Sequence, residues 1–182
     1  MHKILISLIL VSLLMACIPG GFAASPERAA TVDLIENQNA LTDSIRIHQV
    51  QPWRNGSIVL VSYLSDQENE EWSCDALYEV VRNTTGWHIS SSGSGCSSEP
   101  FTGPLTFGSG MPGIPPDVFS YIYGLVNLDD AILAEITWED GVAQRVSIVN
   151  DSFIGLRNGA FPNMAQVQIL NTNEEVIYET GK

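Results

Sequence analysis

Alternation of apolar and polar residues is the feature that most restricts how this chain can fold. From about residue 40 onward, apolar side chains alternate with polar ones, and turn-forming residues return about every eight to twelve positions. Successive side chains of a β-strand point to opposite faces, so such runs are typical of strands with one face in a core. The pattern predicts an all-β protein built as an antiparallel β-sandwich.

Four strands are expected in the first half of the chain. The favoured turn dipeptide Asn55-Gly56 joins the first two strands. The acidic run Asp66–Glu71 follows the second strand and is expected to be a solvated loop, because it lacks the glycine and the ligand pattern of a calcium-binding loop. The expected strands cover residues 45–50, 58–63, 74–82 and 87–92.

The third and fourth strands bring two cysteines together. A three-residue loop, Thr84-Thr85-Gly86, with its glycine in the left-handed conformation, pairs Asn83 with Trp87. Continued along both strands, this register places Cys74 opposite Cys96, at a separation that a disulfide can bridge. A bulge at a later glycine would shift the register by one residue and is left open. The register therefore favours a disulfide between these two cysteines.

Residues 93–117 differ in composition from the rest of the chain. They hold six of the 15 glycines and five of the 9 prolines. Such a content is expected to prevent regular strands, and a loop of this length is unusual inside one compact domain. The segment either links two small β-modules or covers one sandwich. Apolar side chains such as Phe101 and Phe107 favour an ordered loop.

Six strands are expected in the second half, and one hairpin among them has a defined register. A two-residue turn at Asp140-Gly141 would place an arginine on the apolar face. A loop one residue longer pairs Glu135 with Arg145 on the wet face. The same register sets Ala134 opposite Val146 on the apolar face, so it is preferred. The expected strands cover residues 119–126, 132–138, 142–149, 153–156, 165–170 and 175–179.

The beginning of the chain predicts export. Lys3 gives a positive start, and residues 4–15 are apolar apart from two serines. Twelve residues cannot cross a hydrocarbon core, which needs about 20, so this run is expected to be the hydrophobic part of a signal peptide. Its end, Leu14-Met15-Ala16-Cys17, resembles the lipobox of bacterial lipoproteins. An ordinary cleavage site at residues 21–23 would instead remove the cysteine, which could also simply have no role.

The lipobox resemblance implies a location. In that family the cysteine thiol carries a diacylglyceryl group and the leader is cut before it. Two or three acyl chains hold a protein durably in a bilayer. The chain is therefore expected to be fastened through Cys17 to the cell membrane or outer membrane, on the extracytoplasmic side.

The chain is expected to have five segments. The strand order of the second half loosely resembles the small Ig-like β-modules of bacterial surface proteins, a likeness of fold that implies no function. The segments are a signal peptide (1–16), a lipidated tether with room for one helical turn around residues 32–36 (17–40), an N-terminal β-module (41–99), a Gly/Pro-rich loop or linker (100–117) and a C-terminal β-module (118–182).

Acidic residues dominate the charge. The chain has 21 Asp and Glu against 8 Lys and Arg, a net charge of −13, which becomes −14 when Lys3 leaves with the leader. This charge repels nucleic acid phosphates, so no nucleic acid partner is expected. It suits either solubility or a cationic partner. The sequence has no phosphate loop, dinucleotide fingerprint or zinc pattern, and no cofactor or metal is expected.

One candidate binding strip follows from the disulfide hairpin. In the expected register Tyr78 and Arg82 share a face and His88 lies opposite Arg82, while Trp87 and Ile89 belong to a core-facing side. Tyrosine and arginine are frequent interface anchors, so the three residues are candidates for contact with a partner or ligand. The alternative is that Tyr78 packs on a second layer and that Arg82 and His88 close one end of it.

No catalytic motif is present, and enzymatic activity is not expected. The sequence predicts a lipid-anchored extracytoplasmic module that binds an envelope protein partner or has a structural role. Two alternatives stay open. One is an envelope hydrolase that uses His88 with a serine or carboxylate of the Gly/Pro-rich segment. The other is a lipoprotein that binds a cation or small molecule, with Trp53 and Trp72 at its site.

Overall fold

The computed structural model describes residues 23–67, 70–113, 117–160 and 164–180. The predicted signal peptide and Cys17 lie outside the described residues. The elements are α2 (Pro26–Asn37), the 3-10 helix η1 (Thr42–Ser44), β1 (Arg46–Trp53), β2 (Gly56–Gln67), β3 (Glu70–Asn83), β4 (Gly86–Ser97), β5 (Leu105–Gly110), β6 (Phe119–Val126), β7 (Leu133–Trp138), β8 (Ala143–Ser147), β9 (Ser152–Asn158), β10 (Met164–Leu170) and β11 (Val176–Thr180).

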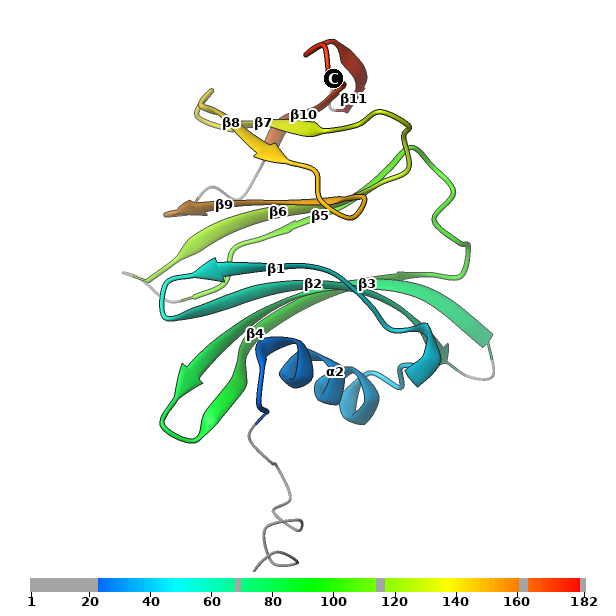
Figure 1. Ribbon diagram of the computed structural model, residues 1–182, viewed down its shortest axis with the longest axis vertical. Helices are drawn as coiled ribbons and strands as arrows, with labels where there is room; N and C mark the ends of the chain where they lie inside the picture. Colours follow the sequence, from blue (N-terminus) through cyan, green and yellow to red (C-terminus); the bar gives the residue numbers. More distant parts are fainter. Residues whose placement is uncertain (1–22, 68–69, 114–116, 161–163, 181–182) are drawn as a thin grey trace, which may run out of the picture.

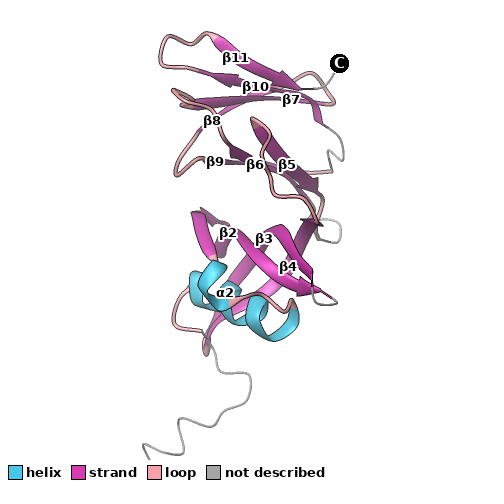
Figure 2. Ribbon diagram, turned by 90° about the vertical axis from the view of Figure 1, so that its right-hand side faces the viewer, coloured by secondary structure: helices cyan, strands magenta, loops and turns pink. Residues whose placement is uncertain are grey.

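These elements stack as four layers (Figure 1). Helix α2 covers sheet A, whose strand order is β1-β2-β3-β4. Sheet B (β5-β6-β9) lies on the other side of sheet A, and sheet C (β11-β10-β7-β8) lies on sheet B. The turned view shows the same sequence of layers (Figure 2). All strand pairs are antiparallel, so the predicted all-β, sandwich-like fold is confirmed, with three sheets in place of two.

Three apolar cores lie between the four layers. The first lies between α2 and sheet A, the second between sheets A and B, and the third between sheets B and C. Strands β2 and β3 are therefore covered on both faces: Val59 and Tyr78 face the helix, whereas Ile58, Leu60 and Leu77 face sheet B. Sheet B contributes to two cores and holds the stack together.

Helix α2 contradicts the predicted tether over residues 26–37. Ser25 caps the helix, because its hydroxyl accepts a hydrogen bond from the backbone N–H of Arg28 at 3.2 Å. Ala29, Ala30 and Leu34 are buried against sheet A. Small side chains on this face let the helix lie close to the sheet, so the segment covers an apolar surface that would otherwise face water.

The Gly/Pro-rich segment also contains strand structure, contrary to expectation. Strand β4 continues to Ser97, and β5 forms the edge of sheet B. Gly108 lies opposite Tyr123 in the β5–β6 register, and a Cβ placed at this glycine would lie 2.5 Å from the tyrosine hydroxyl. Gly110 and Tyr121 repeat the arrangement. The absence of a side chain at these glycines therefore lets the tyrosine rings of β6 lie against β5.

The disulfide prediction is confirmed, although its turn was wrong. Cys74 and Cys96 face each other with a Cα–Cα distance of 4.1 Å and are bonded. The turn has two residues rather than three, since Asn83 pairs with Gly86. A bulge that leaves Ser90 unpaired restores the expected register before the cysteines are reached.

The register predicted for the second-half hairpin is confirmed throughout. Ala134 lies opposite Val146 and Glu135 opposite Arg145, with Arg145 Nε 2.6 Å from the Glu135 carboxylate.

In the first half of the chain, the acidic run Asp66–Glu71 is only partly a loop, because the β2–β3 pairing extends to Gln67 and Glu70.

Candidate functional site

The predicted Tyr78–Arg82–His88 strip does not form. Tyr78 is 1% exposed under α2, where its hydroxyl donates to Asp33 Oδ2 at 3.0 Å. The two-residue turn shifts the end of the hairpin, so Arg82 lies opposite Trp87, with its guanidinium 5.8 Å from the centre of the indole ring. His88 lies opposite Val81, on the other face of the sheet. The alternative reading of Tyr78 as a packing residue is correct.

The two tryptophans proposed for a small-molecule site lie on opposite faces of sheet A. Trp72 packs against the core under α2. Trp53 packs in the core between sheets A and B, with its ring 5.4 Å from that of Phe119. Within the described ranges, no group of three or more His, Cys, Asp or Glu side chains could hold a metal ion.

A different group of polar residues gathers at one end of the layer between sheets A and B. Arg46, Ser62 and Asp75 lie side by side across β1, β2 and β3. They follow the apolar residues Leu60 and Leu77 along the same face. Asp75 is buried, Ser62 is half-buried and Arg46 is exposed, so the row leads from the core to the surface. A buried acid at the end of a polar row is exceptional, which makes this end of the layer the candidate site.

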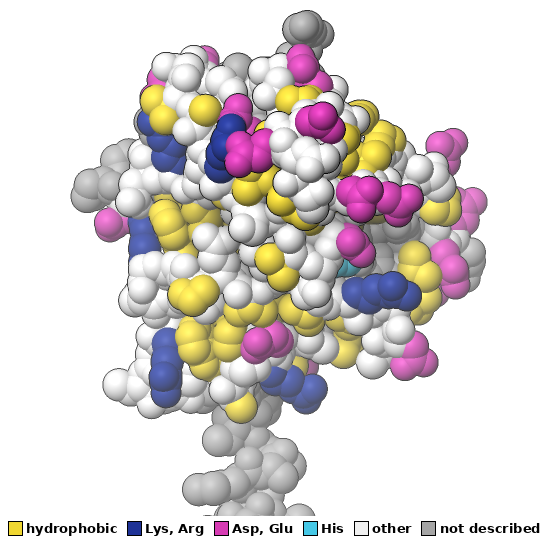
Figure 3. All heavy atoms as spheres, turned by 45° about the horizontal axis from the view of Figure 1, so that its top comes forward, with side chains coloured by type: hydrophobic (Ala, Val, Ile, Leu, Met, Phe, Trp, Pro, Cys, Tyr) yellow, Lys and Arg dark blue, Asp and Glu magenta, His cyan; other side chains and the backbone are white. Residues whose placement is uncertain are grey.

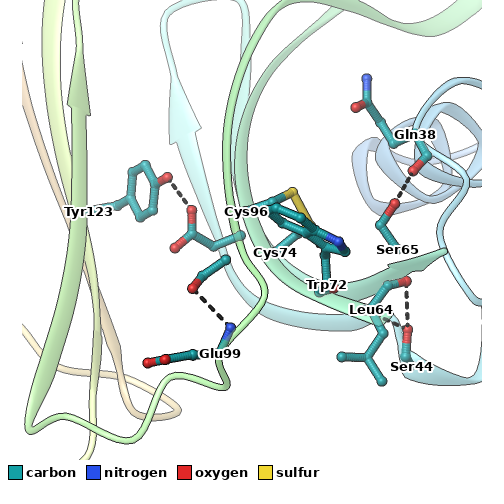
Figure 4. The surroundings of a disulfide bond; sticks show 11 residues. Gln38, Ser44, Leu64, Ser65, Trp72, Cys74, Cys96, Glu99 and Tyr123 are labelled. Carbon is teal, nitrogen blue, oxygen red and sulfur yellow. Dashed lines mark hydrogen bonds between the residues drawn. A yellow bond between two sulfur atoms is a disulfide. The ribbon is translucent and has the colours of Figure 1, made fainter. Parts of the chain in front are cut away.

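Asp75 is the buried acid of this site, with 4% of its surface exposed. The Tyr123 hydroxyl of sheet B donates to Asp75 Oδ1 at 2.6 Å (Figure 4). Burial raises the pKa of Asp75, and the hydrogen bond from Tyr123 partly opposes this. Burial also raises the pKa of Tyr123, and the negative charge of Asp75 adds to that rise. The pair links the two sheets.

His48 completes the site from a bulge in β1. The β1–β2 register shifts between Ile47 and Gln49, which leaves His48 unpaired. Its Nε2 lies 2.8 Å from Ser62 Oγ, and its Nδ1 lies 3.4 Å from the backbone oxygen of Asn150. Burial is the main cause of a lowered His48 pKa, so the imidazole is neutral at neutral pH.

A slot lies between β4 and β5, on the Asp75 side of the site. Its volume is about 320 Å³, and a neighbouring hollow of about 220 Å³ shares Tyr121 with it. Glycines of both strands form its walls, and Tyr121 and Tyr123 lie between the walls. Asp75 and Glu79 are the charged residues that line the two hollows, and no lysine or arginine does so among the described residues.

A larger cavity of about 820 Å³ lies on the Ser62 side of the site. Its lining includes Arg46, Ser62 and Ser73 from sheet A and Asp43 from η1. The two cavities thus adjoin the same polar row from opposite sides, one next to Asp75 and the other next to Ser62.

A sequence signal for this site existed but was ambiguous. Ser62 continues the series Ile58 and Leu60 at every second position, and Asp75 stands in the same relation to Leu77. A polar residue in a core-facing series points to a functional position. Because β2 and β3 are apolar on both faces, the sequence did not show which series faces the second sheet. The bulge at His48 has no marker in the sequence.

The outer surface is mixed in character. Figure 3 shows acidic side chains spread over the face seen from the sheet C end, with hydrophobic side chains between them.

Within the described part of the chain, no helix has the length and apolar character needed to cross a bilayer. No protein-family model, curated protein or solved structure matches this chain, so its site is interpreted from its own chemistry.

Proposed function

We propose that this protein is a lipid-anchored extracytoplasmic binding module, held in the bacterial cell envelope through acyl chains on Cys17. Its ligand is an extended segment of a partner protein, neutral or positively charged, which adds to the edge of β5 beside the slot. The observation that carries the proposal is that β5 is an uncharged edge strand bordering a slot with acidic lining.

The backbone of β5 is suited to accept another strand. Pro104 and Pro112, on either side of β5, accept hydrogen bonds through their carbonyls from Asn127 and Phe119 of the β6 side. Even-numbered residues therefore face β6. Residues 105, 107 and 109 direct their N–H and C=O groups away from it, where the sheet has no further strand within the described residues. Strand addition uses such an edge, because backbone groups supply the affinity.

The edge carries none of the usual protection. Natural edge strands are commonly guarded by charges or prolines, but β5 contains neither. Phe107 and the adjoining Met111 are 40% and 44% exposed. The other three edges of sheets B and C are charged, with Arg157 in β9, Arg145 in β8 and Glu179 in β11. Among the edges of sheets B and C, β5 is therefore the one without a charge. In sheet A the edge strand β4 also lacks charges and prolines, and it forms the opposite wall of the slot.

Charge decides the kind of partner. A second copy of this chain, without its leader, would bring a further −14 to the contact, whereas a neutral or basic segment would be accepted beside Asp75 and Glu79. We therefore assign the edge to a different protein rather than to self-association.

The anchor fits the order of the layers. Ala23 pairs with Trp87 at the turn end of β4, on the helix side of sheet A. Six residues, 17–22, separate it from the lipid, a span of at most about 20 Å. Anchored in this way, the protein has its α2 layer nearest the bilayer and sheet C farthest from it.

Peptide binding tests the slot. A synthetic decapeptide of alternating lysine and valine is expected to bind, and one of alternating glutamate and valine is not. Ser109→Pro removes an N–H that points away from β6 and is expected to weaken binding at least about tenfold. Ser147→Pro is the matched control on β8, where the hydrogen bonds at Val142 and Ile148 also turn residue 147 outward. Equal binding by the wild type and Ser109→Pro contradicts the proposal.

Labelling tests the anchor. Cells that express the full chain are fed an alkyne-tagged fatty acid, and the purified protein is expected to carry the tag. Cys17→Ala is expected to lose it and to leave the membrane fraction. An unlabelled wild type, or undiminished labelling of Cys17→Ala, contradicts the anchor without bearing on the slot.

A further inference from the structure

Ser62 and His48 have the geometry of a nucleophile and its general base. His48 Nε2 lies 2.8 Å from Ser62 Oγ, within hydrogen-bond reach. A proton on Nδ1 is directed to the backbone oxygen of Asn150 at 3.4 Å, which leaves Nε2 free to accept the serine proton. This is the tautomer that a base needs for activating a serine.

The imidazole is held from two sides. The side-chain amide of Asn150 donates to the backbone oxygen of His48 at 3.0 Å, so the two residues are tied together twice. Asn150 belongs to a tight turn, closed by the pairing of Val149 with Ser152, that leads from β8 to β9. The ring is thus fixed between sheet A and the connection of sheets C and B, and burial keeps it neutral by lowering its pKa.

Ser62 also opens to a space that can take a substrate. It lines the cavity of about 820 Å³. Arg46 lines the same cavity and lies directly opposite Ser62 in the β1–β2 register. A positive charge beside a serine nucleophile stabilises the oxyanion that forms when a carbonyl is attacked.

We propose that Ser62 is an acyl-accepting nucleophile, that His48 is its base, and that the pair hydrolyses small carboxylic esters in the cavity beside η1. Ser62 Oγ bonds to the carbonyl carbon while its proton passes to His48 Nε2. The tetrahedral species collapses, the bond to the alcohol oxygen breaks, and the alcohol leaves with that proton. Water then attacks the acyl-serine and gives a proton to His48 Nε2. The bond between the acyl carbon and Ser62 Oγ breaks, and that proton returns to the serine oxygen as the acid leaves. The net reaction converts ester and water to acid and alcohol.

This activity is separate from peptide binding. The ester cavity lies on the Ser62 side of the polar row, and the slot lies on the Asp75 side. The hydrolase considered from the sequence used His88, which is exposed on β4. In the present proposal a different histidine, His48 in the bulge of β1, is the base.

A fluorophosphonate probe tests the nucleophile. Incubated with the folded, disulfide-bonded protein and mapped by mass spectrometry, it is expected to modify Ser62. Ser62→Ala is expected to lose the adduct, and His48→Gln to slow its formation by about 100-fold or more. Ser73→Ala is the matched control: Ser73 lines the same cavity and has no hydrogen bond to a histidine within the described residues, so labelling is expected to be unchanged.

A second readout separates catalysis from a structural role. Hydrolysis of p-nitrophenyl acetate by the wild type is expected to rise with pH as His48 loses its proton, with a midpoint below the ordinary histidine pKa of 6.5. His48→Gln is expected to lose this titration while keeping the wild-type circular dichroism. An absence of the Ser62 adduct in folded wild-type protein overturns the proposal. Labelling at the wild-type rate in His48→Gln also overturns it.

Discussion

Tyr78 and Tyr123 are both buried tyrosines that donate a hydrogen bond to an aspartate, yet they join different layers. Tyr78 bonds Asp33 at 3.0 Å and ties sheet A to α2. Tyr123 bonds Asp75 at 2.6 Å and ties sheet B to sheet A. The two contacts differ in their acceptor, because Asp75 is buried within a sheet whereas Asp33 is only half-buried on the helix. Only the second bond is made to a buried carboxyl group, which also accepts a hydrogen bond from the backbone of Gly95.

Tyr123→Phe is therefore expected to lower the free energy of unfolding by about 1–3 kcal/mol at pH 7, the cost of removing a hydrogen bond from a buried acceptor. Tyr121→Phe is the matched control, because its hydroxyl has no hydrogen-bond partner among the described residues. Urea unfolding of both variants measures the difference. Losses of equal size would show that the bond to Asp75 has no special role.

The pH dependence of this effect has a defined sign. The folded-state pKa of Asp75 is raised, so its contribution to stability is present below about pH 4 and is lost as pH rises through the folded pKa. Removing the Tyr123 donor raises that pKa further, because the hydrogen bond favours the ionised form. The Tyr123→Phe deficit is therefore expected to be larger at pH 7 than at pH 4.

At the scale of elements, α2 is the part whose role the sequence least suggested. Leu34 is fully buried, whereas its neighbour Ile35 is 39% exposed. Leu34→Ala is expected to lower the free energy of unfolding by about 2–5 kcal/mol, since it leaves a cavity between helix and sheet. Ile35→Ala is expected to change it by only about 0.5 kcal/mol. Chemical denaturation of the two neighbouring variants measures this. Equal effects would restore the view of the segment as a tether.

Among the elements, the edge strand β5 carries the proposed binding function. Gly108 and Gly110 make room for tyrosine rings, so β5 is shaped by packing toward β6 while its other edge stays open. Strand β5 thus packs against the tyrosine rings of β6, while the backbone groups at its other edge are available to bind a partner strand. This explains why a glycine-rich segment is ordered.

For the whole molecule, sheet B connects the layers, because it packs against sheet A on one face and sheet C on the other. Arg54, in the turn between β1 and β2, donates to the backbone oxygen of Asp117 at 2.8 Å and to Asn158 Oδ1 at 3.0 Å. Its guanidinium lies 5.1 Å from the centre of the Phe119 ring. Sheets A and B are therefore joined at Arg54 as well as at Tyr123, through the core between them.

A single unfolding transition is expected from this arrangement. Trp53, Trp72 and Trp87 belong to sheet A, and Trp138 belongs to sheet C. In a Trp138→Phe variant, fluorescence reports on sheet A alone, whereas far-ultraviolet circular dichroism reports on every layer. The two curves are expected to coincide in urea. A fluorescence transition separated from the dichroism transition would indicate two independent β-modules.

Much of the local structure could be predicted because it depends on neighbours in the chain. The alternation gave the strand positions, Phe119–Val126 to the residue. The Glu135–Arg145 pairing followed from charge and turn length, and the cysteine pairing held because a bulge compensated for the shorter turn. The lipobox resemblance stays a prediction, since Cys17 lies outside the described residues.

The candidate site depended on contacts that alternation does not encode. His48 contacts Ser62 from a bulge in β1, and Tyr123 reaches Asp75 between two sheets and 48 positions away in sequence. By itself the sequence determined the strands and most of their local pairing, because those properties depend on short-range periodicity. Only the tertiary structure decided which face each strand buried and which polar groups met there, because that choice depends on how the layers stack.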